Sequence, residues 1–309
     1  VLPLVGRRLP IIADDHVDVE FGTGALKITP GHDVNDFEIG RRHGLEEISV
    51  IGEDGRMTAE AGERFEGMTV AEAQVEVVKA LKEEGALSGE EEYVHSVPFS
   101  ERSGERIEPL ISLQWFCQMD ELARPAIEAV EDGRVNIAPG QWKRVYLDWM
   151  REIRPWCVSR QLWWGHRIPV WYRGNETYVG ETEPEGEGWV QEEDVLDTWF
   201  SSAIWPFATL GWPDETDELK AFYPTDFLTT AREILFLWVA RMIMTGLEFA
   251  GDVPFHDVYV HSVIQARDGR RMSKSLGTGI DPLEEIDEHG ADALRFGLLS
   301  GATAFIAVD

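Results

Sequence analysis

Residues 226–264 read DFLTTAREILFLWVARMIMTGLEFAGDVPFHDVYVHSVI. Their apolar pattern predicts a strand at 226–229, a buried helix at 232–247 and a second strand at 258–264. Two further helices are expected downstream, at 282–289 and 292–299. Alternating strands and helices imply parallel strands joined by crossover helices, so the expected fold class is α/β with a doubly wound, Rossmann-like sheet. Such sheets bind ligands beyond the carboxyl ends of their strands.

The loop after the second expected strand, residues 267–277, reads RDGRRMSKSLG. Its four basic residues and two hydroxyl groups lie at the carboxyl end of a parallel strand, where they suit the gripping of phosphate groups. The same composition is also typical of an ordinary exposed basic loop. Composition alone therefore leaves both interpretations open.

The net charge of the chain is −29, from 28 basic and 57 acidic residues. Taken alone, this charge argues against a nucleic-acid-binding protein, because the chain would repel phosphate. The charge is uneven, however. Residues 46–92 carry 14 acidic and 4 basic side chains, residues 174–220 carry 13 and 1, and residues 141–173 carry 2 and 7. Since salt screens such interactions within about 10 Å, the local window decides what binds there.

Other features of the composition exclude several classes of protein. With 43% hydrophobic and 28% charged residues, the chain is typical of a globular protein of about two domains. Its two cysteines, Cys117 and Cys157, exclude a disulfide framework and a four-cysteine zinc site, and they favour the cytoplasm. The apolar run 234–240 is too short to span a membrane, so no membrane partner is expected. Residue 1 is Val, so we expect an internal piece of a longer protein.

All 12 tryptophans fall between Trp115 and Trp238, which favours a domain boundary near Ser100. Residues 1–100 are predicted to form a small mixed α/β domain, with strands at 17–21, 26–29 and 47–51 and helices at 35–43 and 70–84. Residues 101–309 form the second expected domain. Within it, residues 174–193 are expected to be an acidic insertion loop, with ETEPEGEG at 181–188 in solvent.

The string MSKSLG at residues 272–277 resembles the KMSKS signature of the class I aminoacyl-tRNA synthetases. Three longer strings resemble the valyl-tRNA synthetases in particular: GTGALKITPGHDVNDFEIGRRHGL at 22–45, WCVSRQLWWGHRIPVWY at 156–172 and DVLDTWFSSAIWPFATLGWP at 194–213. The isoleucyl and leucyl enzymes share the plan, but their corresponding strings differ. The resemblance covers nearly the whole chain. It implies part of an editing domain at 1–100 and the second half of the catalytic domain at 101–309.

In that family, the carboxylate of valine attacks the α-phosphorus of ATP, and the valyl group then passes to its tRNA. Catalysis there is positioning and electrostatic stabilisation, without a protein nucleophile. The resemblance assigns the catalytic contacts with the phosphates of ATP, which arrives with Mg²⁺ as substrate, to Lys274, Ser273, Ser275 and Arg271, and further ATP contacts to Met272 and Glu233. Arg271 stands where the family most often has Lys, so a planar fork replaces a compact ammonium.

Glu233 follows the strand expected at 226–229. A carboxylate at a strand-to-helix turn can accept both ribose hydroxyls of a nucleotide, and the resemblance assigns this role to Glu233. The alternative is an acid that interacts with the dipole at a helix N-terminus. Ala231 departs from a glycine common there in the family, and its methyl group would crowd the adenosine.

Ile234 and Trp238 lie four residues apart on the expected helix and therefore share one face. From the residues alone, this spacing is typical of core packing. The resemblance implies instead that they form, with Trp199, an apolar pocket for the isopropyl group of valine. Such a pocket cannot strongly reject threonine, which has nearly the same volume, so the family needs a second, hydrolytic site.

The second site is implied for residues 22–36. Lys27 and Thr29 alternate onto one face of an expected strand, and Asp33 and Asp36 lie at i and i+3 around a helix start. The resemblance assigns all four to the editing pocket, where they would anchor an α-ammonium, bond a threonine hydroxyl and orient a water. The alternative for Asp33 is ordinary helix capping. Ligand number and spacing disfavour a metal at His32, Asp33 and Asp36, so no protein-bound metal is expected.

The basic segment 141–173 is the expected contact for the acceptor end of tRNA. Its residues Trp163, Trp164 and Trp171 can stack on bases, although core packing is the favoured interpretation of each one. The HIGH signature of the family does not occur, so we expect a central fragment that forms no adenylate alone. The alternatives are an isoleucyl- or leucyl-type fragment, a free-standing aminoacyl-tRNA editing hydrolase, and an RNA-binding piece without turnover.

Overall fold

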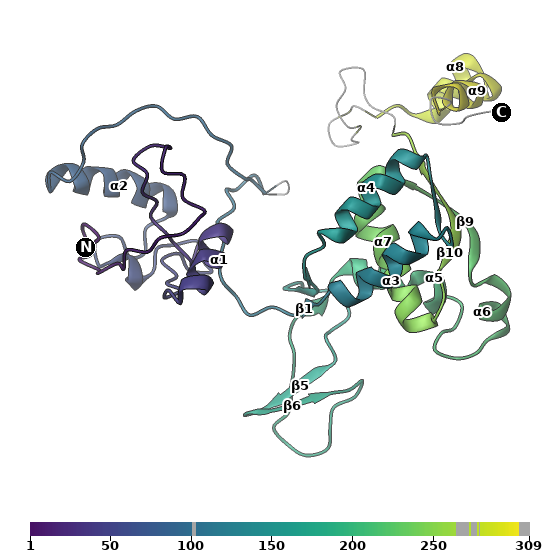
Figure 1. Cartoon of the computed structure of the whole chain (residues 1–309), viewed down its shortest axis with the longest axis horizontal. Helices are drawn as coiled ribbons and strands as arrows, with labels where there is room; N and C mark the ends of the chain where they lie inside the picture. Colours follow the sequence, from purple (N-terminus) through teal and green to yellow (C-terminus); the bar gives the residue numbers. More distant parts are fainter. Residues whose placement is uncertain (101–102, 264–271, 273–276, 278, 303–309) are drawn as a thin grey trace. The chain divides into compact units, whose positions relative to one another are not determined.

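The computed structural model describes residues 1–100, 103–263, 272, 277 and 279–302 (Figure 1). The chain divides into two compact units, Val1–Leu113 (unit 1) and Gln114–Asp309 (unit 2). This division lies C-terminal to the boundary near Ser100 that the tryptophan distribution predicts. All 12 tryptophans belong to unit 2.

The helices of unit 1 are α1 (Val34–His43), α2 (Val70–Glu83) and a 3-10 turn at Ala59–Ala61. Their ends follow from local capping. The Asp33 carboxylate accepts hydrogen bonds from the first turn of α1, which ends at Gly44 in the left-handed conformation. Thr69 and Glu72 form a reciprocal capping box at the start of α2. Both α-helices agree with the prediction to within one residue at either end.

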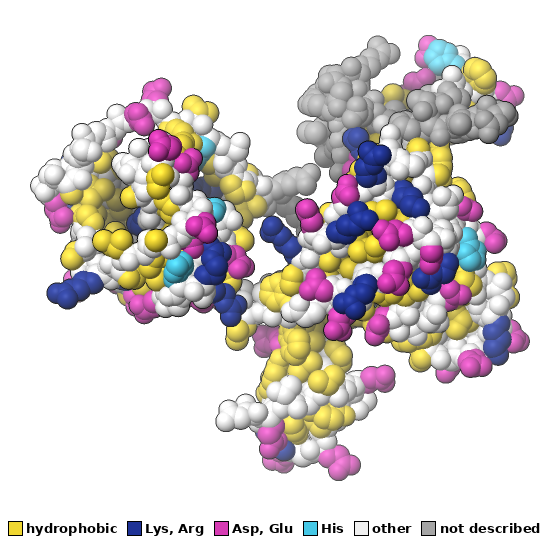
Figure 2. All heavy atoms as spheres, viewed as in Figure 1, with side chains coloured by type: hydrophobic (Ala, Val, Ile, Leu, Met, Phe, Trp, Pro, Cys, Tyr) yellow, Lys and Arg dark blue, Asp and Glu magenta, His cyan; other side chains and the backbone are white. Residues whose placement is uncertain are grey.

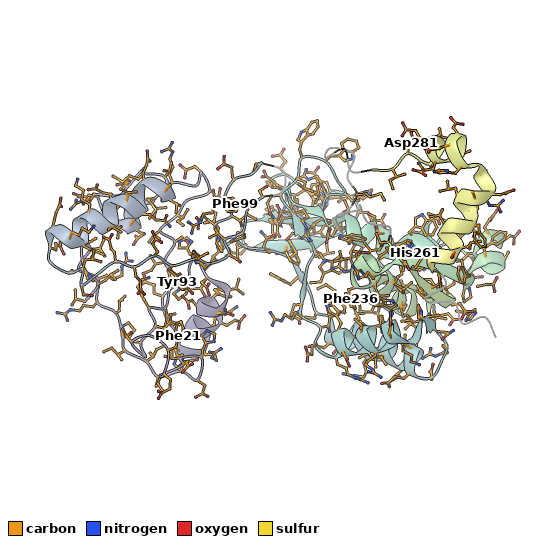
Figure 3. The ribbon with its side chains drawn as sticks, turned by 90° about the horizontal axis from the view of Figure 1, so that it is seen from above. Phe21, Tyr93, Phe99, Phe236, His261 and Asp281 are labelled. Atoms are coloured by element: carbon orange, nitrogen blue, oxygen red, sulfur yellow. The ribbon has the colours of Figure 1, made fainter. Side chains whose placement is uncertain are left out.

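The three strands predicted in unit 1 are wrong. Residues 17–21, 26–29 and 47–51 form turns and extended chain, and the described part of unit 1 contains isolated bridges, such as Ile51 to Met57, but no strand. A strand needs a neighbour that pairs with its N–H and C=O groups over several residues, whereas residues 47–51 are paired through the single bridge of Ile51 and Met57 and the hydrogen bond from Thr58 N to Val50 O. The apolar side chains of 17–21 also remain largely in solvent, since Val19 and Phe21 are 73% and 75% exposed, whereas Ile51 is buried. Figure 3 shows Phe21 at the edge of the unit.

Unit 2 is built on a parallel sheet with the order β2 (Asn136–Ala138), β10 (Phe255–His261) and β9 (Thr225–Ala231). The register of β9 and β10 runs from Thr225 opposite Phe255 to Ala231 opposite His261. Two of these strands and the helical crossover between them confirm the predicted α/β class. The three residues of β2 are too few to show a period, so the sequence did not reveal that strand.

The crossover after β9 is helical as predicted, but its geometry is mixed. A 3-10 turn at Arg232–Ile234 leads into a π-helical turn at Leu235–Val239, then α7 (Ala240–Thr245) and a second π-helical turn at Gly246–Ala250. Leu235, Val239 and Ile243 are fully buried. Core packing therefore fixes this segment, and the sequence period does not reveal the change of helix type.

The other helices of unit 2 are α3 (Asp120–Glu131), α4 (Gly140–Arg151), α5 (Thr198–Ala208), α6 (Asp217–Phe222), α8 (Pro282–His289) and α9 (Ala291–Ala302). Helices α3, α4 and α7 lie against the sheet (Figure 1). Together they enclose one hydrophobic core, in which Tyr146, Ile137 and Val258 are buried. The prediction of α8 is confirmed at both ends. No helix in the described ranges is long and apolar enough to cross a membrane.

Short antiparallel strands complete unit 2. They are β1 (Phe116–Cys117) with β3 (Trp156–Cys157), β4 (Ser159–Arg160) with β8 (Val195–Leu196), and the sheet of β6 (Glu176–Val179), β5 (Val170–Arg173) and β7 (Val190–Gln191). Residues 174–193, expected to be a loop, therefore contain two strands. Residues 181–188 are exposed turns and bends, as expected.

Candidate functional site

The carboxyl edge of the parallel sheet lies where β9 ends at Ala231 and β10 ends at His261, directly opposite each other. Figure 3 labels His261 in unit 2. Parallel pairing brings the segments after both strands to the same edge, which is where this class of sheet binds ligands. Of the loop after β10, the structure describes Met272, which is half-buried, and Gly277. The predicted phosphate contacts Lys274, Ser273, Ser275 and Arg271 lie outside the described residues.

Glu233 lies in the first turn after β9, at this carboxyl edge. Its carboxylate pairs with the preceding residue, Arg232, with 3.2 Å between Oε1 and Nε. Both side chains are about half exposed. The carboxylate is therefore accessible at the edge where a nucleotide would bind, while its role as a ribose ligand stays a prediction.

The predicted apolar pocket draws on two adjoining elements. Trp199 lies in the first turn of α5, and Trp238 lies in the π-helical turn after β9. The indole N–H of Trp238 donates to the carbonyl of Ser202 on α5, at 3.2 Å, and both indoles pack against the core of unit 2. Ile234 ends the 3-10 turn with φ −113° and ψ 12°, outside the α-helical region, so the shared face expected from α-helical spacing does not follow here.

A charged cluster that the sequence did not reveal supports α5. Asp197 is 4% exposed and caps the helix through the N–H of Trp199, at 3.3 Å. Its Oδ2 accepts from Trp156 Nε1 at 3.0 Å and from Arg160 Nη2 at 2.8 Å. Arg241 Nη1 lies 3.8 Å from the same oxygen. The Asp-Thr-Trp string signals a helix cap, but nothing in it points to partners that lie about 40 residues away.

The four residues predicted for editing lie together in unit 1. Lys27 Nζ donates to Thr29 Oγ1 at 2.5 Å, and the backbone N–H of Thr29 donates to Asp36 Oδ2 at 2.7 Å. The N–H of Asp36 in turn donates to Asp33 Oδ1 at 3.0 Å. Asp36 is buried, whereas Lys27 and Asp33 are exposed. Capping of α1 by Asp33 is confirmed, and it does not exclude a second role.

The turn that carries these residues is held by its neighbours. A Cβ on Gly31 would lie 2.1 Å from the carbonyl oxygen of Ile48, so only glycine allows this close approach. His32 Nε2 accepts the N–H of Val50 at 2.8 Å, which leaves the ring proton on Nδ1 to donate to Pro109 O at 2.9 Å. His32 therefore joins this turn to Val50 and Pro109 by hydrogen bonds, which is a structural role. The described residues contain no cluster of three His, Cys, Asp or Glu side chains that suits a metal ion.

Most basic side chains of the segment 141–173 already bind other groups of the protein, so fewer are available for tRNA than the charge of the segment suggests. Four of its seven bases, Arg151, Arg160, Arg167 and Arg173, bind carboxylates or carbonyls of unit 2. Figure 2 shows basic and acidic side chains interspersed over α3 and α4. The prediction that Trp163 and Trp164 pack in the core is wrong, since these side chains are 99% and 85% exposed. Both residues lie in an exposed bend at 163–165, just before the isolated bridge of Arg167 and Val195.

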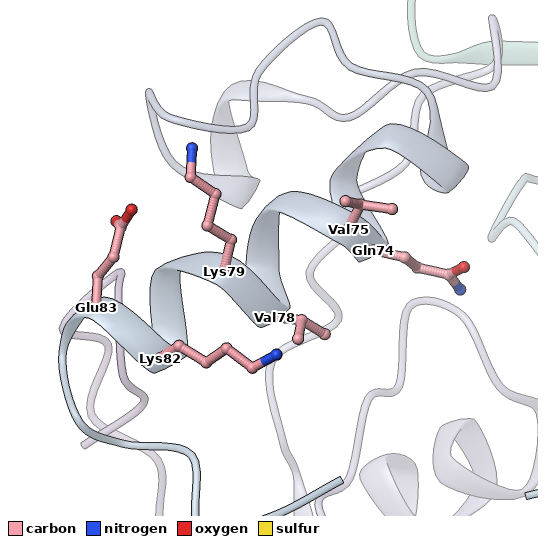
Figure 4. A pocket seen from close by; sticks show the side chains of 6 residues that line it. All are labelled: Gln74, Val75, Val78, Lys79, Lys82 and Glu83. Atoms are coloured by element: carbon pink, nitrogen blue, oxygen red, sulfur yellow. The ribbon is translucent and has the colours of Figure 1, made fainter. Parts of the chain in front are cut away.

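Two of the concave sites among the described residues are large enough to hold a small ligand. The first, of about 590 Å³, follows an exposed side of α2 between Gln74 and Glu83, and its side chains diverge rather than converge (Figure 4). The second, of about 410 Å³, lies in unit 2 between the end of α4, β3 and Arg241. Neither is lined by a residue predicted for ATP, valine or editing.

Comparison with known proteins assigns the family. Residues 33–190 and 182–307 match the family described as tRNA synthetases class I (I, L, M and V). Valine–tRNA ligases of Staphylococcus carnosus and Halalkalibacterium halodurans are 53% and 55% identical, each over 98% of this chain. The chain spans 35% of the length of each. Methionyl-tRNA synthetase of Mycobacterium tuberculosis in complex with methionyl-adenylate is similar with a TM-score of 0.49 and 18% identity, over 67% of this chain and 37% of that one. The chain belongs to the class I aminoacyl-tRNA synthetases of the I, L, M and V group.

Proposed function

We propose that the chain is the central part of an enzyme that joins L-valine to its tRNA through valyl adenylate and hydrolyses mischarged threonyl-tRNA. The observation that carries this proposal is 53–55% identity to valine–tRNA ligases over 98% of the chain. The same identity disfavours an isoleucyl- or leucyl-type enzyme. ATP, with Mg²⁺ as part of that substrate, and a valine-accepting tRNA are the expected partners.

In the synthetic reaction, the valine carboxylate attacks the α-phosphorus of ATP and pyrophosphate leaves. Lys274, with Ser273, Ser275 and Arg271, stabilises the charge that develops on the phosphate oxygens. Glu233 accepts the ribose hydroxyls at the carboxyl edge of the sheet. The accessible carboxylate in the first turn after β9 supports this role.

The amino acid binds against Trp199 and Trp238. The hydrogen bond from Trp238 to the carbonyl of Ser202 supports the assignment, because it fixes the helix that bears one indole against the helix that bears the other. A rigid apolar pocket distinguishes substrates by volume and excludes larger side chains. It distinguishes valine poorly from threonine, so the enzyme needs hydrolytic correction.

Editing is supported by the connected geometry of Lys27, Thr29, Asp33 and Asp36. Because Thr29 Oγ1 accepts from Lys27, its own O–H remains able to donate to a threonine hydroxyl. Asp36 uses Oδ2 for the backbone of Thr29, which leaves Oδ1 to orient a water or bind an ammonium. A valine side chain would leave these polar groups unpaired, and the site would therefore reject it.

The test of synthesis is valine-dependent ATP–pyrophosphate exchange by the full-length enzyme. Lys274→Ala should lower kcat by at least about 100-fold, since it removes a charge that contacts the reacting phosphates. The 309-residue chain alone should show no exchange, and appreciable exchange by it would contradict the fragment assignment. A full-length enzyme that exchanges with isoleucine but not with valine would contradict the valine assignment.

The test of editing is hydrolysis of threonyl-tRNA, with valyl-tRNA as the matched substrate. Asp36→Ala should abolish hydrolysis of threonyl-tRNA and leave exchange intact. A free-standing editing hydrolase predicts instead that the 309-residue chain hydrolyses threonyl-tRNA and that Lys274→Ala has no effect on any activity. An RNA-binding piece predicts salt-sensitive tRNA binding with no turnover in either assay.

A further inference from the structure

The cavity of about 410 Å³ in unit 2 has an unusual set of charges. Three guanidinium groups and one carboxylate line it, together with two indole rings, from Arg154, Arg160, Arg241, Glu152, Trp149 and Trp156. A cavity needs only about 10–15 Å³ of such volume to hold one water, so this volume is ample for a small anion. The excess of guanidinium groups indicates a site for negative charge.

Arg241 is the most deeply placed of these cations. Its side chain is 10% exposed, and its guanidinium carbon lies 3.8 Å from the ring centre of Trp156. Nη1 of Arg241 is buried and has no hydrogen-bond partner among the described residues. The nearest carboxylate oxygen, Asp197 Oδ2, lies 3.8 Å away, which is too far for a hydrogen bond.

Asp197 cannot satisfy both arginines that face it. Its Oδ2 already accepts from Arg160 Nη2 and from the indole N–H of Trp156, at 2.8 and 3.0 Å. Two guanidinium groups therefore face one carboxylate, which forms a hydrogen bond with Arg160 but not with Arg241. Burial lowers the pKa of Arg241 to about 10, against the opposing effect of Asp197, so the group is still charged at neutral pH. A buried donor of this kind is unfavourable unless an acceptor reaches it.

We propose that this cavity binds one phosphate group through Arg241, Arg160 and Arg154. Guanidinium groups present planar pairs of donors that match phosphate oxygens, and they remain charged where a lysine would lose its proton. A phosphate supplies the acceptor that Arg241 lacks, and its charge balances the excess of arginine. Arg154 is exposed at the rim, where it can meet the ligand first.

Two sources share this chemistry, the backbone of a single-stranded RNA end and free inorganic phosphate. The proposal that RNA is the ligand rests on the proposed function, whereas the proposal that the cavity binds a phosphate group does not. An RNA backbone that passes the cavity would place one phosphate on Arg241, and the exposed Trp163 and Trp164 lie in the same unit. Single-stranded RNA stacks on such indoles.

The experiment titrates the 309-residue chain with inorganic phosphate, and separately with a single-stranded RNA hexanucleotide, against chloride at equal ionic strength. Tryptophan fluorescence reports binding, because Trp149 and Trp156 line the cavity. Arg241→Met keeps the length of the side chain and its packing on Trp156, and it should weaken phosphate binding about tenfold or more. Arg154→Gln, at the rim, should weaken it several-fold.

Arg134→Gln is the matched control, since Arg134 pairs with Asp132 and does not line the cavity, and it should leave binding unchanged. If RNA is the ligand, RNA competes with phosphate, and Arg241→Met lowers the slope of log affinity against log salt by about one. If phosphate binds and RNA does not compete, the ligand is free phosphate. Either result supports the site.

The proposal is overturned if neither probe binds the unmodified chain, or if Arg241→Met and Arg154→Gln both bind as the unmodified chain does. Circular dichroism of each variant checks that it folds. If Arg241→Met does not fold, Arg154→Gln, at an exposed position, still tests the proposal. The assay measures no valine activation. Failure here leaves the exchange assay of the full-length enzyme untouched, and failure of that assay leaves phosphate binding untouched.

Discussion

Each unit of the molecule contains a buried carboxylate, but the partners of the two differ in kind. Asp36 in unit 1 accepts from the backbone N–H of Thr29, a neutral donor seven residues away. Asp197 in unit 2 accepts from an indole and from the guanidinium of Arg160, and it lies beside Arg241. The first fixes a local turn. The second joins segments distant in the sequence, so we expect its loss to affect a whole unit.

The largest effect should come from Asp197→Ala. This change leaves Arg160 and Arg241 without a carboxylate, and breaking a buried ion pair of this kind costs about 3–5 kcal/mol. Urea unfolding followed by tryptophan fluorescence measures the loss in unit 2, because all the tryptophans lie there. Asp194→Ala is the control, since Asp194 accepts from Gln161 at the surface. If Asp194→Ala and Asp197→Ala lower the free energy of unfolding equally, the buried ion pairs of Asp197 do not carry the stability assigned to them.

Asp36→Ala should have a smaller and more local effect. It leaves the N–H of Thr29 without its acceptor, which costs about 1–3 kcal/mol. Hydrogen exchange at the Thr29 amide should become faster, while the tryptophan transition of unit 2 should not move. Asp36→Asn keeps an acceptor oxygen and should lose less. A shift of the tryptophan transition in Asp36→Ala would show that the effect is not local.

Arg241→Met should raise the free energy of unfolding of unit 2 by about 1 kcal/mol, because it removes a buried donor that lacks a hydrogen-bond partner while Asp197 keeps its ion pair with Arg160. The pKa of Arg241 is lowered to about 10 from an ordinary value of 12.5. The charged form therefore destabilises the fold fully below pH 10, and the folded state gains stability as pH rises above 10. The difference in urea midpoint between variant and parent should shrink from pH 7 to pH 11, and a constant difference would exclude this cause.

Asp33→Ala should have an effect of similar size but opposite sign, because it removes the cap of α1 and costs about 1 kcal/mol. Amide exchange at Asn35 and Asp36 should become faster, because both N–H groups lose their acceptor. Asp33→Ser should restore most of the protection. If Asp33→Ala abolishes editing of threonyl-tRNA but Asp33→Ser does not, the residue contributes through the helix start rather than through its charge.

Local signals in the sequence explain where prediction succeeded. Asp33, Thr69 and Asp281 cap α1, α2 and α8, so the starts of these helices were predictable to within one residue. The expected strands of unit 1 failed for a different reason. Alternation of apolar residues predicts a strand only where another strand supplies hydrogen bonds, and the sequence does not show whether one does.

The two sites differ in the same way, since one is formed by residues close in the sequence and the other by residues far apart. The four residues predicted for editing lie within ten positions of each other. The family resemblance assigned them as a set, and they do lie together, although the strand expected for Lys27 and Thr29 does not form. The Asp197 cluster draws on Trp156, Arg160 and Arg241, which come from different elements, so only the tertiary fold reveals it. Exposure of Trp163 and Trp164 was missed because an aromatic residue carries no local sign of its surroundings.

The π-helical turn at Leu235–Val239 has a consequence for how this chain tolerates changes of length. A π-helical turn closes i→i+5 hydrogen bonds, so it amounts to an α-helix with one extra residue. Since each residue of an α-helix turns the chain by about 100°, deleting one residue there would rotate Trp238 relative to β9 by about that angle. A single-codon deletion would thus redirect an indole without shortening the helix by a full turn, whereas a substitution at the same place would change only one side chain.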